Sequence, residues 1–267
     1  MPLSKIETSD VNRYKEQRSK EIAISGGDKN KPLDISKCKN TSNGTINREL
    51  AVVSHLFNQA VEWKWIQFRP AKIDRLEEKE GRKFYLTKEQ IARVKEMAAK
   101  DNNPDILKFM LIGLDTSMRM SEILKIKQEH IDIERKLIYV PDSKTGSRAQ
   151  PITKRLAAYL EVELKGLSSE QEWLFPSPKS ATGHVVNIAK AYRRVIAAAG
   201  LNPSEIVRHT MRHTVITHLV QDGVDLPTVM RISGHKTLIM VQRYAHQNGE
   251  HIQEAMDRLE IRLDIAA

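Results

Sequence analysis

Seven polar residues of the chain have the types and the order expected of a site that acts on a phosphate ester. They are Arg119, Glu122, Lys144, His209, Arg212, His235 and Tyr244. An arginine keeps its positive charge at any working pH and offers a planar fork of donors that fits phosphate oxygens. A tyrosine hydroxyl becomes a nucleophile when a neighbouring group accepts its proton. Taken together, these residues could bind a phosphodiester, neutralise the charge that develops on it, and attack it.

Taken singly, several of these residues have a plainer interpretation. Arg119 and Glu122 are three positions apart, which also suits an ordinary ion pair within one helix. Lys144 falls in a predicted turn, where lysine is common. Tyr244 lies in a short amphipathic helix, where a tyrosine often packs half-buried. The case for chemistry therefore rests on the whole group of residues.

The histidines allow a metal-site alternative. His209 and His213 are four residues apart, as metal-binding histidines on one helix face can be, but no HExxH motif or adjacent carboxylate completes such a site. We expect His213 to pack or to cap a helix. His209 and Arg212 stand at a predicted helix start, where free backbone N–H groups and the helix dipole favour an anion.

Composition sets the broad class of protein. Of 267 residues, 43 are Lys or Arg and 34 are Asp or Glu, so the formal charge is +9, and 40% of residues are hydrophobic. This balance predicts a folded protein of one or two domains with a polyanionic partner. The single cysteine, Cys38, excludes an intramolecular disulfide and a multi-cysteine zinc site. Because the sequence has no signal-peptide pattern and no apolar run near the roughly 18 residues that span a bilayer, we expect a cytoplasmic protein.

The elements that must position these residues fall into two parts. In the first part we predict a helix from Ser9 or Asp10 to Ile24, a polar loop over residues 26–44, and an amphipathic helix from Thr45. This part is expected to end near Pro70. The charge-dense residues 71–83 are predicted to be a linker, which gives domains at residues 1–70 and 84–267.

The second part is predicted to be helical around a short antiparallel sheet. Thr87 and Gln90 form a capping-box pattern at the start of a helix that runs to about Lys100, and Asn102–Pro104 opens a buried helix. The strands are expected at residues 131–133, 136–140 and 148–152, and further helices at 154–165, 185–199, 211–222, 226–232, 238–245 and 250–263. The fold class is therefore mainly α with a small antiparallel β-sheet, an α+β arrangement.

Three stretches of the sequence resemble the tyrosine recombinase family, which includes the phage integrases. Residues 209–246 (HTMRHTVITHLVQDGVDLPTVMRISGHKTLIMVQRYAH) look like the family's HxxR box, its GH dipeptide and its nucleophilic tyrosine. Residues 116–132 (TSMRMSEILKIKQEHID) resemble the box with the first arginine. Residues 45–66 resemble the family's helical, SAM-like core-binding domain, which would precede a catalytic domain.

The resemblance implies a role for each polar residue. Tyr244 would attack DNA to give a 3′-phosphotyrosyl intermediate. Arg119, Arg212 and His235 would hold the phosphate, and Glu122 would orient the arginines. His209 would assist proton transfer from the tyrosine. Lys144, on the hairpin, would protonate the departing 5′ oxygen. This chemistry would need no metal and no nucleotide cofactor.

The resemblance also implies partners. Double-stranded DNA with a specific recombination site would be the substrate, bound by four protomers on two paired sites, with a monomer expected in the absence of DNA. Accessory DNA-bending or directionality factors, a phage or mobile-element origin, and a place at the bacterial nucleoid would follow. The helix expected at residues 250–263 would either pack on its own domain or dock on a neighbouring protomer.

Two departures from the family pattern keep alternatives open. Ser117 stands where the family usually has glycine, and the chain begins almost directly at core-binding-like sequence, whereas many phage integrases have an arm-binding domain before it. The alternatives are a DNA-binding regulator of the same fold that does not cleave, a type IB topoisomerase-like enzyme that relaxes supercoils as a monomer, and a helix-turn-helix regulator.

Overall fold

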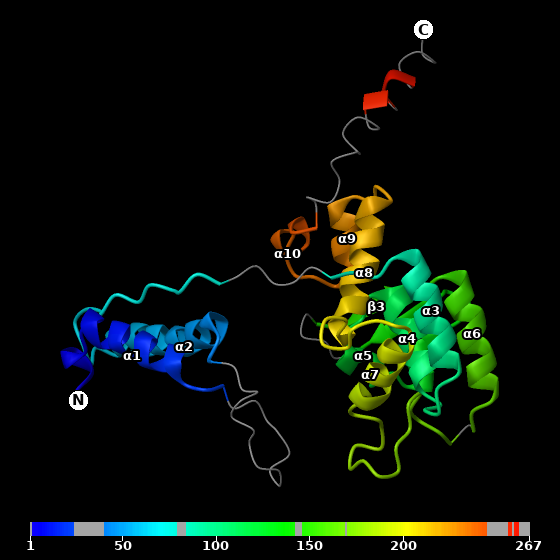
Figure 1. Ribbon diagram of the computed structural model, residues 1–267, viewed down its shortest axis with the longest axis horizontal. Helices are drawn as coiled ribbons and strands as arrows, with labels where there is room; N and C mark the ends of the chain where they lie inside the picture. The colour runs from blue at the N-terminus through cyan, green and yellow to red at the C-terminus, as the bar shows by residue number, and fades with distance from the viewer. Residues whose placement is uncertain are drawn as a thin grey trace. The chain divides into compact units, whose positions relative to one another are not determined.

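The computed structural model of the protein describes residues 2–23, 40–78, 84–141, 146–168, 170–244, 256–257 and 259–261. The chain divides into two compact units, Met1–Arg82 and Lys83–Ala267 (Figure 1). Cys38 and Lys144 lie outside the described residues, as does most of the helix predicted at residues 250–263. No helix within the described residues is long and apolar enough to cross a membrane.

The first unit is built on two helices, α1 (Thr8–Lys20) and α2 (Asn43–Glu62), after a short 3-10 turn, η1 (Leu3–Lys5). Apolar side chains at helical spacing on the two helices form a small core of Val11, Ile46, Leu50 and Phe57, which Ala71 from the segment after α2 completes. Arg18 of α1 clamps Glu49 of α2, with Nη2 and Oε1 3.0 Å apart.

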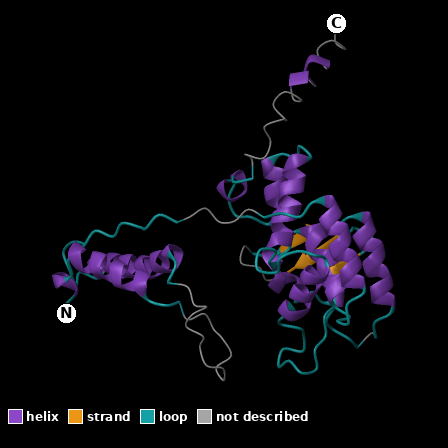
Figure 2. Cartoon of the chain, in the orientation of Figure 1, coloured by secondary structure: helices purple, strands orange, loops and turns teal. Residues whose placement is uncertain are grey.

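The second unit surrounds a small sheet with helices (Figure 2). The strands β1 (Ile131–Asp132), β2 (Leu137–Val140) and β3 (Arg148–Pro151) pair antiparallel in the order β1-β2-β3. The helices are α3 (Lys88–Ala99), α4 (Ile106–Thr116), α5 (Met120–Ile123), α6 (Lys154–Lys165), α7 (Ala189–Ala198), α8 (Arg208–Gln221), α9 (Leu226–Ser233) and α10 (Ile239–Gln242), with a 3-10 turn, η3 (Gln128–His130). The predicted fold class, mainly α with one small antiparallel sheet, is confirmed.

Close packing of α4 against α8 sets the frame of the site. The two helices cross where α4 carries Gly113, and a Cβ at that position would lie 2.8 Å from Met211 Cε on α8. The absence of a side chain therefore lets the helix backbones approach. Since α4 leads directly to Arg119 and α8 carries Arg212, this crossing brings the two arginines' elements together.

Three helices are shorter than the sequence predicts. Helix α10 spans only Ile239–Gln242 of the predicted residues 238–245, and Arg243 and Tyr244 form a turn after it. Helices α1 and α7 are shorter because residues beside them pair with another segment. The first helix ends at Lys20 because Ile22 forms a bridge with Asn40. The helix α7 begins at Ala189 instead of residue 185, because Val185 donates its backbone N–H to the Phe175 carbonyl at 2.9 Å.

Two other helices begin earlier than predicted. Helix α2 begins at Asn43, because Ser42 caps it by accepting a hydrogen bond from the Thr45 N–H. Helix α8 begins at Arg208, which places His209 and Arg212 within its first two turns. The predicted capping box of Thr87 with Gln90 is present at α3.

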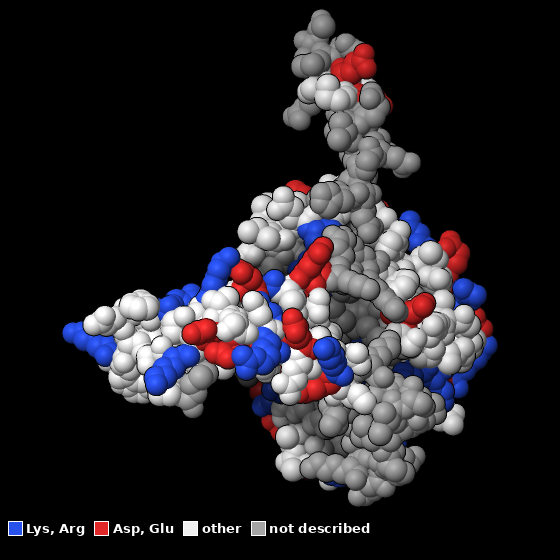
Figure 3. Space-filling view, turned by 60° about the vertical axis from the view of Figure 1, so that its left-hand side comes forward, with Lys and Arg blue, Asp and Glu red and all other residues white. Residues whose placement is uncertain are grey.

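A separate apolar cluster holds α10 and the turn after it against α8. It consists of Ile216, Val220, Val229, Val241 and Tyr244, from α8, α9, α10 and the turn after α10. On the surface, Lys and Arg side chains are interspersed with Asp and Glu on the face drawn in Figure 3.

Candidate catalytic site

Arg119 is placed by a strained turn at the end of α4. Ser117 adopts a left-handed conformation with φ 56°, and the chain then leaves α4 and restarts as α5, with Arg119 at its N-cap. Thr116 holds the turn: its hydroxyl donates to the Ile112 carbonyl at 2.7 Å and accepts from the Met118 N–H at 3.2 Å. A serine in this conformation costs about 1 kcal/mol relative to glycine. Ser117 is therefore strained at the position where the resemblance expects glycine.

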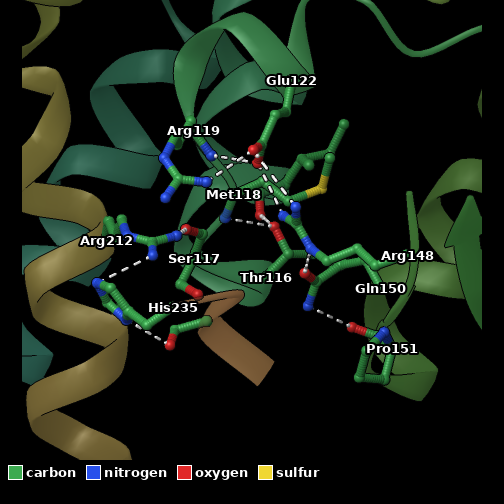
Figure 4. Close-up of polar contacts among 12 residues, drawn as sticks. Thr116, Ser117, Met118, Arg119, Glu122, Arg148, Gln150, Pro151, Arg212 and His235 are labelled. Carbon is green, nitrogen blue, oxygen red and sulfur yellow. Dashed lines mark hydrogen bonds and ion pairs between the residues drawn. The ribbon is translucent and has the colours of Figure 1, made fainter. Parts of the chain in front are cut away.

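Glu122 gathers three groups of donors around one buried carboxylate. It accepts from the Arg119 backbone N–H at 3.0 Å and from Arg119 Nη1 at 2.9 Å. Arg148 donates from Nη2 at 2.8 Å and from Nη1 at 3.3 Å (Figure 4). Burial alone would raise the pKa of Glu122, but the hydrogen bonds from Arg148 and Arg119 outweigh it and hold the pKa below its usual value. The carboxylate is therefore ionised and fixes the orientation of Arg119.

Arg148 is a site residue that the sequence reasoning missed. It is the first residue of β3, pairs with Val140 of β2, and shares a sheet face with the buried Gln150. That alternation was a usable signal, because residues two apart on a strand point to the same side. Arg148 also leaves little room for a side chain at position 234, since a Cβ on Gly234 would lie 2.9 Å from Arg148 Nε. Glycine before His235 is thus required both by this contact and by its φ of 63°.

Arg212 links the turn that carries Arg119 to His235. It is 2% exposed, and its Nη1 donates to the Ser117 carbonyl at 2.8 Å. Its Nη2 lies 3.1 Å from His235 Nε2 (Figure 4). Burial, and next the charge of Arg119, lowers the pKa of Arg212 to about 10. The guanidinium is still charged at neutral pH. The charges of Arg119 and Arg212 therefore lie near each other, and the Glu122 carboxylate lies between Arg119 and Arg148.

His235 is neutral and has a defined tautomer. Burial and the charges of Arg212 and Arg119 lower its pKa to about 3. Because an arginine can only donate, His235 Nε2 is the acceptor, and its Nδ1 carries the hydrogen, which it donates to Ser233 Oγ at 2.7 Å. Ser233, at the end of α9, thus orients the ring toward Arg212.

Tyr244 is buried, and its hydroxyl contacts a histidine. The side chain is 6% exposed within the apolar cluster, and its Oη lies 2.5 Å from His213 Nδ1. Burial raises the pKa of Tyr244, against the lowering effect of Arg243 and Arg212. Burial, with the nearby charges of His209, Arg243 and Arg212, lowers the pKa of His213 to about 4. The expectation that His213 would pack or cap a helix missed this contact.

His209 was expected to assist proton transfer from Tyr244, but it does not contact the Tyr244 hydroxyl in the described structure. It is exposed on the first turn of α8, and its ring stands edge-on to the His213 ring, with centroids 4.7 Å apart. Among the described residues, the hydroxyl of Tyr244 is hydrogen-bonded to His213 and not to His209.

The structure therefore brings most of the predicted residues into one region of the second unit. Glu122 binds Arg119 and Arg148, and Arg212 binds His235 and the carbonyl of Ser117, two residues before Arg119. Tyr244 meets α8 at His213, the residue after Arg212. Within the described residues, no group of three or more His, Cys, Asp or Glu side chains is placed to hold a metal ion. Such an array of two guanidinium groups and a histidine beside a phenol suits a phosphodiester.

Comparison with protein families finds a match in this region. A model described as the phage integrase family matches residues 84–251, which is more than half of the chain.

Several curated relatives match most of the chain. A shufflon-specific DNA recombinase of Escherichia coli is 27% identical over 262 residues, covering 96% of this chain and 62% of that protein. The tyrosine recombinase XerA of Thermococcus kodakarensis is 27% identical over 231 residues, covering 82% of this chain and 78% of XerA. The integrase of Escherichia phage 186 is 27% identical over 253 residues, covering 91% and 66%. The chain thus spans less than two thirds of the length of the first of these relatives.

Solved structures share the fold. A structure of the Tn1549 transposon integrase in complex with transposon right end DNA has a TM-score of 0.74 at 19% identity, covering 97% of this chain and 87% of that one. A structure of the XerH site-specific recombinase bound to difH substrate has a TM-score of 0.66 at 19% identity, covering 95% and 71%.

Proposed function

The chain belongs to the phage integrase family of tyrosine recombinases, and on this premise we propose that it is a site-specific DNA recombinase. It would cut and rejoin DNA strands through a 3′-phosphotyrosyl intermediate, in the integration or excision of a phage or another mobile element. The observation that carries the proposal is the placement of Arg212 directly before His213, whose ring contacts the hydroxyl of Tyr244. Arg212 binds the Ser117 carbonyl in the turn before Arg119 and contacts His235.

In the proposed cleavage step, the Tyr244 hydroxyl oxygen attacks the phosphorus and the bond from phosphorus to the 5′ oxygen breaks. Arg119 and Arg212 hold the nonbridging oxygens and stabilise the charge of the five-coordinate transition state. A bound phosphate would displace Arg212 from His235 Nε2 and raise the pKa of that ring, so that His235 could donate a hydrogen bond to the phosphate. Lys144, predicted at the hairpin between β2 and β3, would supply the proton to the leaving 5′ oxygen.

Rejoining reverses the same step. A 5′ hydroxyl from a second strand attacks the phosphotyrosyl phosphorus and releases Tyr244, so the energy of the phosphodiester is kept in the protein–DNA bond. When the incoming hydroxyl comes from a different duplex, the strands are exchanged. Glu122 would hold Arg119 in place through both directions.

We propose duplex DNA as the partner and a tetramer on two paired sites as the working assembly. The DNA complexes of the Tn1549 integrase and of XerH, which share the fold, support duplex DNA as the partner. Residues 1–70 would be the core-binding domain, residues 71–83 the linker, and residues 84–267 the catalytic domain. Binding through phosphate contacts would weaken steeply with salt. The protein would then be found at the nucleoid, with accessory DNA-bending or directionality factors setting the direction of reaction.

Covalent trapping tests the proposal directly. The protein and the variant Tyr244→Phe are incubated with supercoiled DNA that carries the gene's native flanking region, and the reaction is stopped in SDS. A DNA-linked protein that forms with the natural chain and not with Tyr244→Phe is the expected result. No adduct, with salt-sensitive binding to the same DNA retained, would instead identify a DNA-binding protein of this fold that does not cleave.

A further inference from the structure

We propose that His213 is the catalytic residue that accepts the proton of the Tyr244 hydroxyl, a role that the HxxR pattern would give to His209. This inference rests on the function proposed above and assigns one proton transfer within it. It starts from the contact between Tyr244 Oη and His213 Nδ1 at 2.5 Å.

The contact is held from both sides. His213 is on α8 directly after Arg212, whose guanidinium is fixed by the Ser117 carbonyl. Tyr244 is fixed by its backbone N–H, which donates to the Val241 carbonyl at 2.9 Å, and by its apolar neighbours on α8, α9 and α10. The His213 and Tyr244 rings lie with centroids 5.7 Å apart at 39°. The proton acceptor and the phosphate clamp therefore occupy consecutive residues of one helix.

Chemistry sets the direction of the hydrogen bond. Burial keeps the phenol of Tyr244 protonated and the imidazole of His213 neutral at neutral pH, because the two pKa values lie far apart on either side of it. The hydroxyl must then donate and Nδ1 must accept, which puts the ring hydrogen of His213 on Nε2. This is the arrangement that a general base needs before the reaction begins.

His209 is in contact with the base and not with the nucleophile. Its exposed ring stands edge-on to the His213 ring. As a neighbour it lowers the pKa of His213, together with Arg212 on the same helix and Arg243 next to Tyr244. These three groups and Tyr244 are the titratable or charged groups that the described structure sets around His213.

Bound DNA would strengthen this base. A phosphodiester held by Arg212 and Arg119 brings a negative charge that offsets the arginines, and the pKa of His213 rises toward its usual value. As the bond from Tyr244 to phosphorus forms, the hydroxyl proton moves to His213 Nδ1, and the bond to the 5′ oxygen breaks as Lys144 protonates it. In rejoining, the His213 imidazolium returns its proton to the departing Tyr244 oxygen, so one residue is base and then acid.

The hydrogen bond can be tested without DNA. Nitrogen-15 NMR of histidine in the full chain should show His213 as a neutral ring with hydrogen on Nε2 and a hydrogen-bonded Nδ1. Tyr244→Phe should remove the hydrogen-bond signature, and the matched variant His209→Ala should leave it in place. A His213 ring with its hydrogen on Nδ1 would overturn the proposal, whatever the protein does to DNA.

The catalytic role is tested on a nicked duplex containing the cut site mapped with the natural chain. We expect His213→Asn, which keeps an acceptor near the Nδ1 position but takes no proton, to slow adduct formation about 10²–10⁴-fold. His213→Ala should be slowed similarly and partly restored by free imidazole. Retained DNA affinity and an unchanged melting temperature would show that these variants are folded.

A second substrate separates the base from the acid. With sulfur in place of the bridging 5′ oxygen, the leaving group no longer needs a proton, so Lys144→Ala should recover its cleavage rate and His213→Ala should not. Wild-type rates in His213→Asn, or imidazole rescue of His209→Ala but not of His213→Ala, would overturn the assignment. In either case an adduct in the natural chain would leave the proposed function standing. A natural chain without an adduct would contradict that function instead.

Discussion

At the scale of the residue, the site depends on buried groups whose charge states are set by their surroundings. His235 and His213 are both neutral because burial and neighbouring arginines lower their pKa values, to about 3 and about 4. Arg212 stays charged despite burial. In the proposed function, the phosphodiester would bind beside the neutral His235 and the charged Arg212.

These two histidines predict how stability depends on pH. A histidine with a lowered pKa in the folded state binds its proton more readily when unfolded, so its stabilising effect is full above about 6.5 and declines as pH falls toward 3 to 4. Between pH 7 and 4.5 we expect the free energy of unfolding to fall by roughly 1–3 kcal/mol per histidine. Urea unfolding at several pH values checks this, and His235→Asn should flatten the slope. An equal slope in His235→Asn would contradict the assigned state.

Ser117 gives a second prediction at this scale. It combines a left-handed backbone with a buried hydroxyl that has no hydrogen-bond partner among the described residues. Ser117→Gly should raise the free energy of unfolding by about 0.5–1 kcal/mol, because glycine relieves the strain and removes the hydroxyl. The matched variant Ser117→Ala removes only the hydroxyl and keeps the strain, so it should gain less. If chemical unfolding ranks alanine above glycine, the strain is not the larger effect.

At the scale of the element, β3 holds the turn that carries Arg119. Arg148 and Glu122 have side chains that are 14% and 4% exposed, so their ion pair is largely shielded from water. The strand therefore contributes a fixed counter-charge. Arg148, the first residue of β3, holds the start of this strand against Glu122. Lys144 is predicted in the hairpin between β2 and β3.

Loss of Arg148 should therefore damage more than the strand. Arg148→Ala would leave the buried Glu122 carboxylate with Arg119 as its remaining arginine, and we expect the free energy of unfolding to fall by about 2–4 kcal/mol. Arg148→Lys keeps the charge but cannot reach both oxygens of Glu122, so it should recover only part of the loss. Unfolding in urea measures each cost.

A double-mutant cycle separates the pair from the individual residues. Glu122→Gln with Arg148→Ala should cost clearly less than the sum of the two single changes, because the second change removes a group already left unpaired. Additive costs would show that the two side chains stabilise the fold independently.

At the scale of the whole molecule, the proposed reaction requires several copies of the chain. One active site holds one Tyr244, and strand exchange between two duplexes cuts two strands at a time. We expect sedimentation to give a monomer without DNA and a particle of four protomers with two duplexes that carry the mapped site. Duplexes with a scrambled site are the control. Supercoil relaxation by a particle with a single protomer would instead fit a type IB topoisomerase-like enzyme.

The sequence by itself determined most of the elements and the family. Short segments between turn residues located the three strands, the Thr87–Gln90 pattern located the start of α3, and the order and spacing of Arg119, Arg212, His235 and Tyr244 indicated the family. These features depend on local periodicity, capping and order along the chain, which a sequence carries directly. The limits of α7 and of α1 were less predictable, because pairing with distant segments ended them.

Only the tertiary structure decided which polar groups touch. Arg148 meets Glu122 across 26 positions, and His213 meets Tyr244 across 31. Nothing local separates His213 from His209 on α8, since both are histidines four residues apart on one helix. The turn after α10, packed on Val220 and Val229, directs the Tyr244 hydroxyl to His213. Packing of distant apolar side chains, which no local pattern encodes, therefore selects the partner of the Tyr244 hydroxyl.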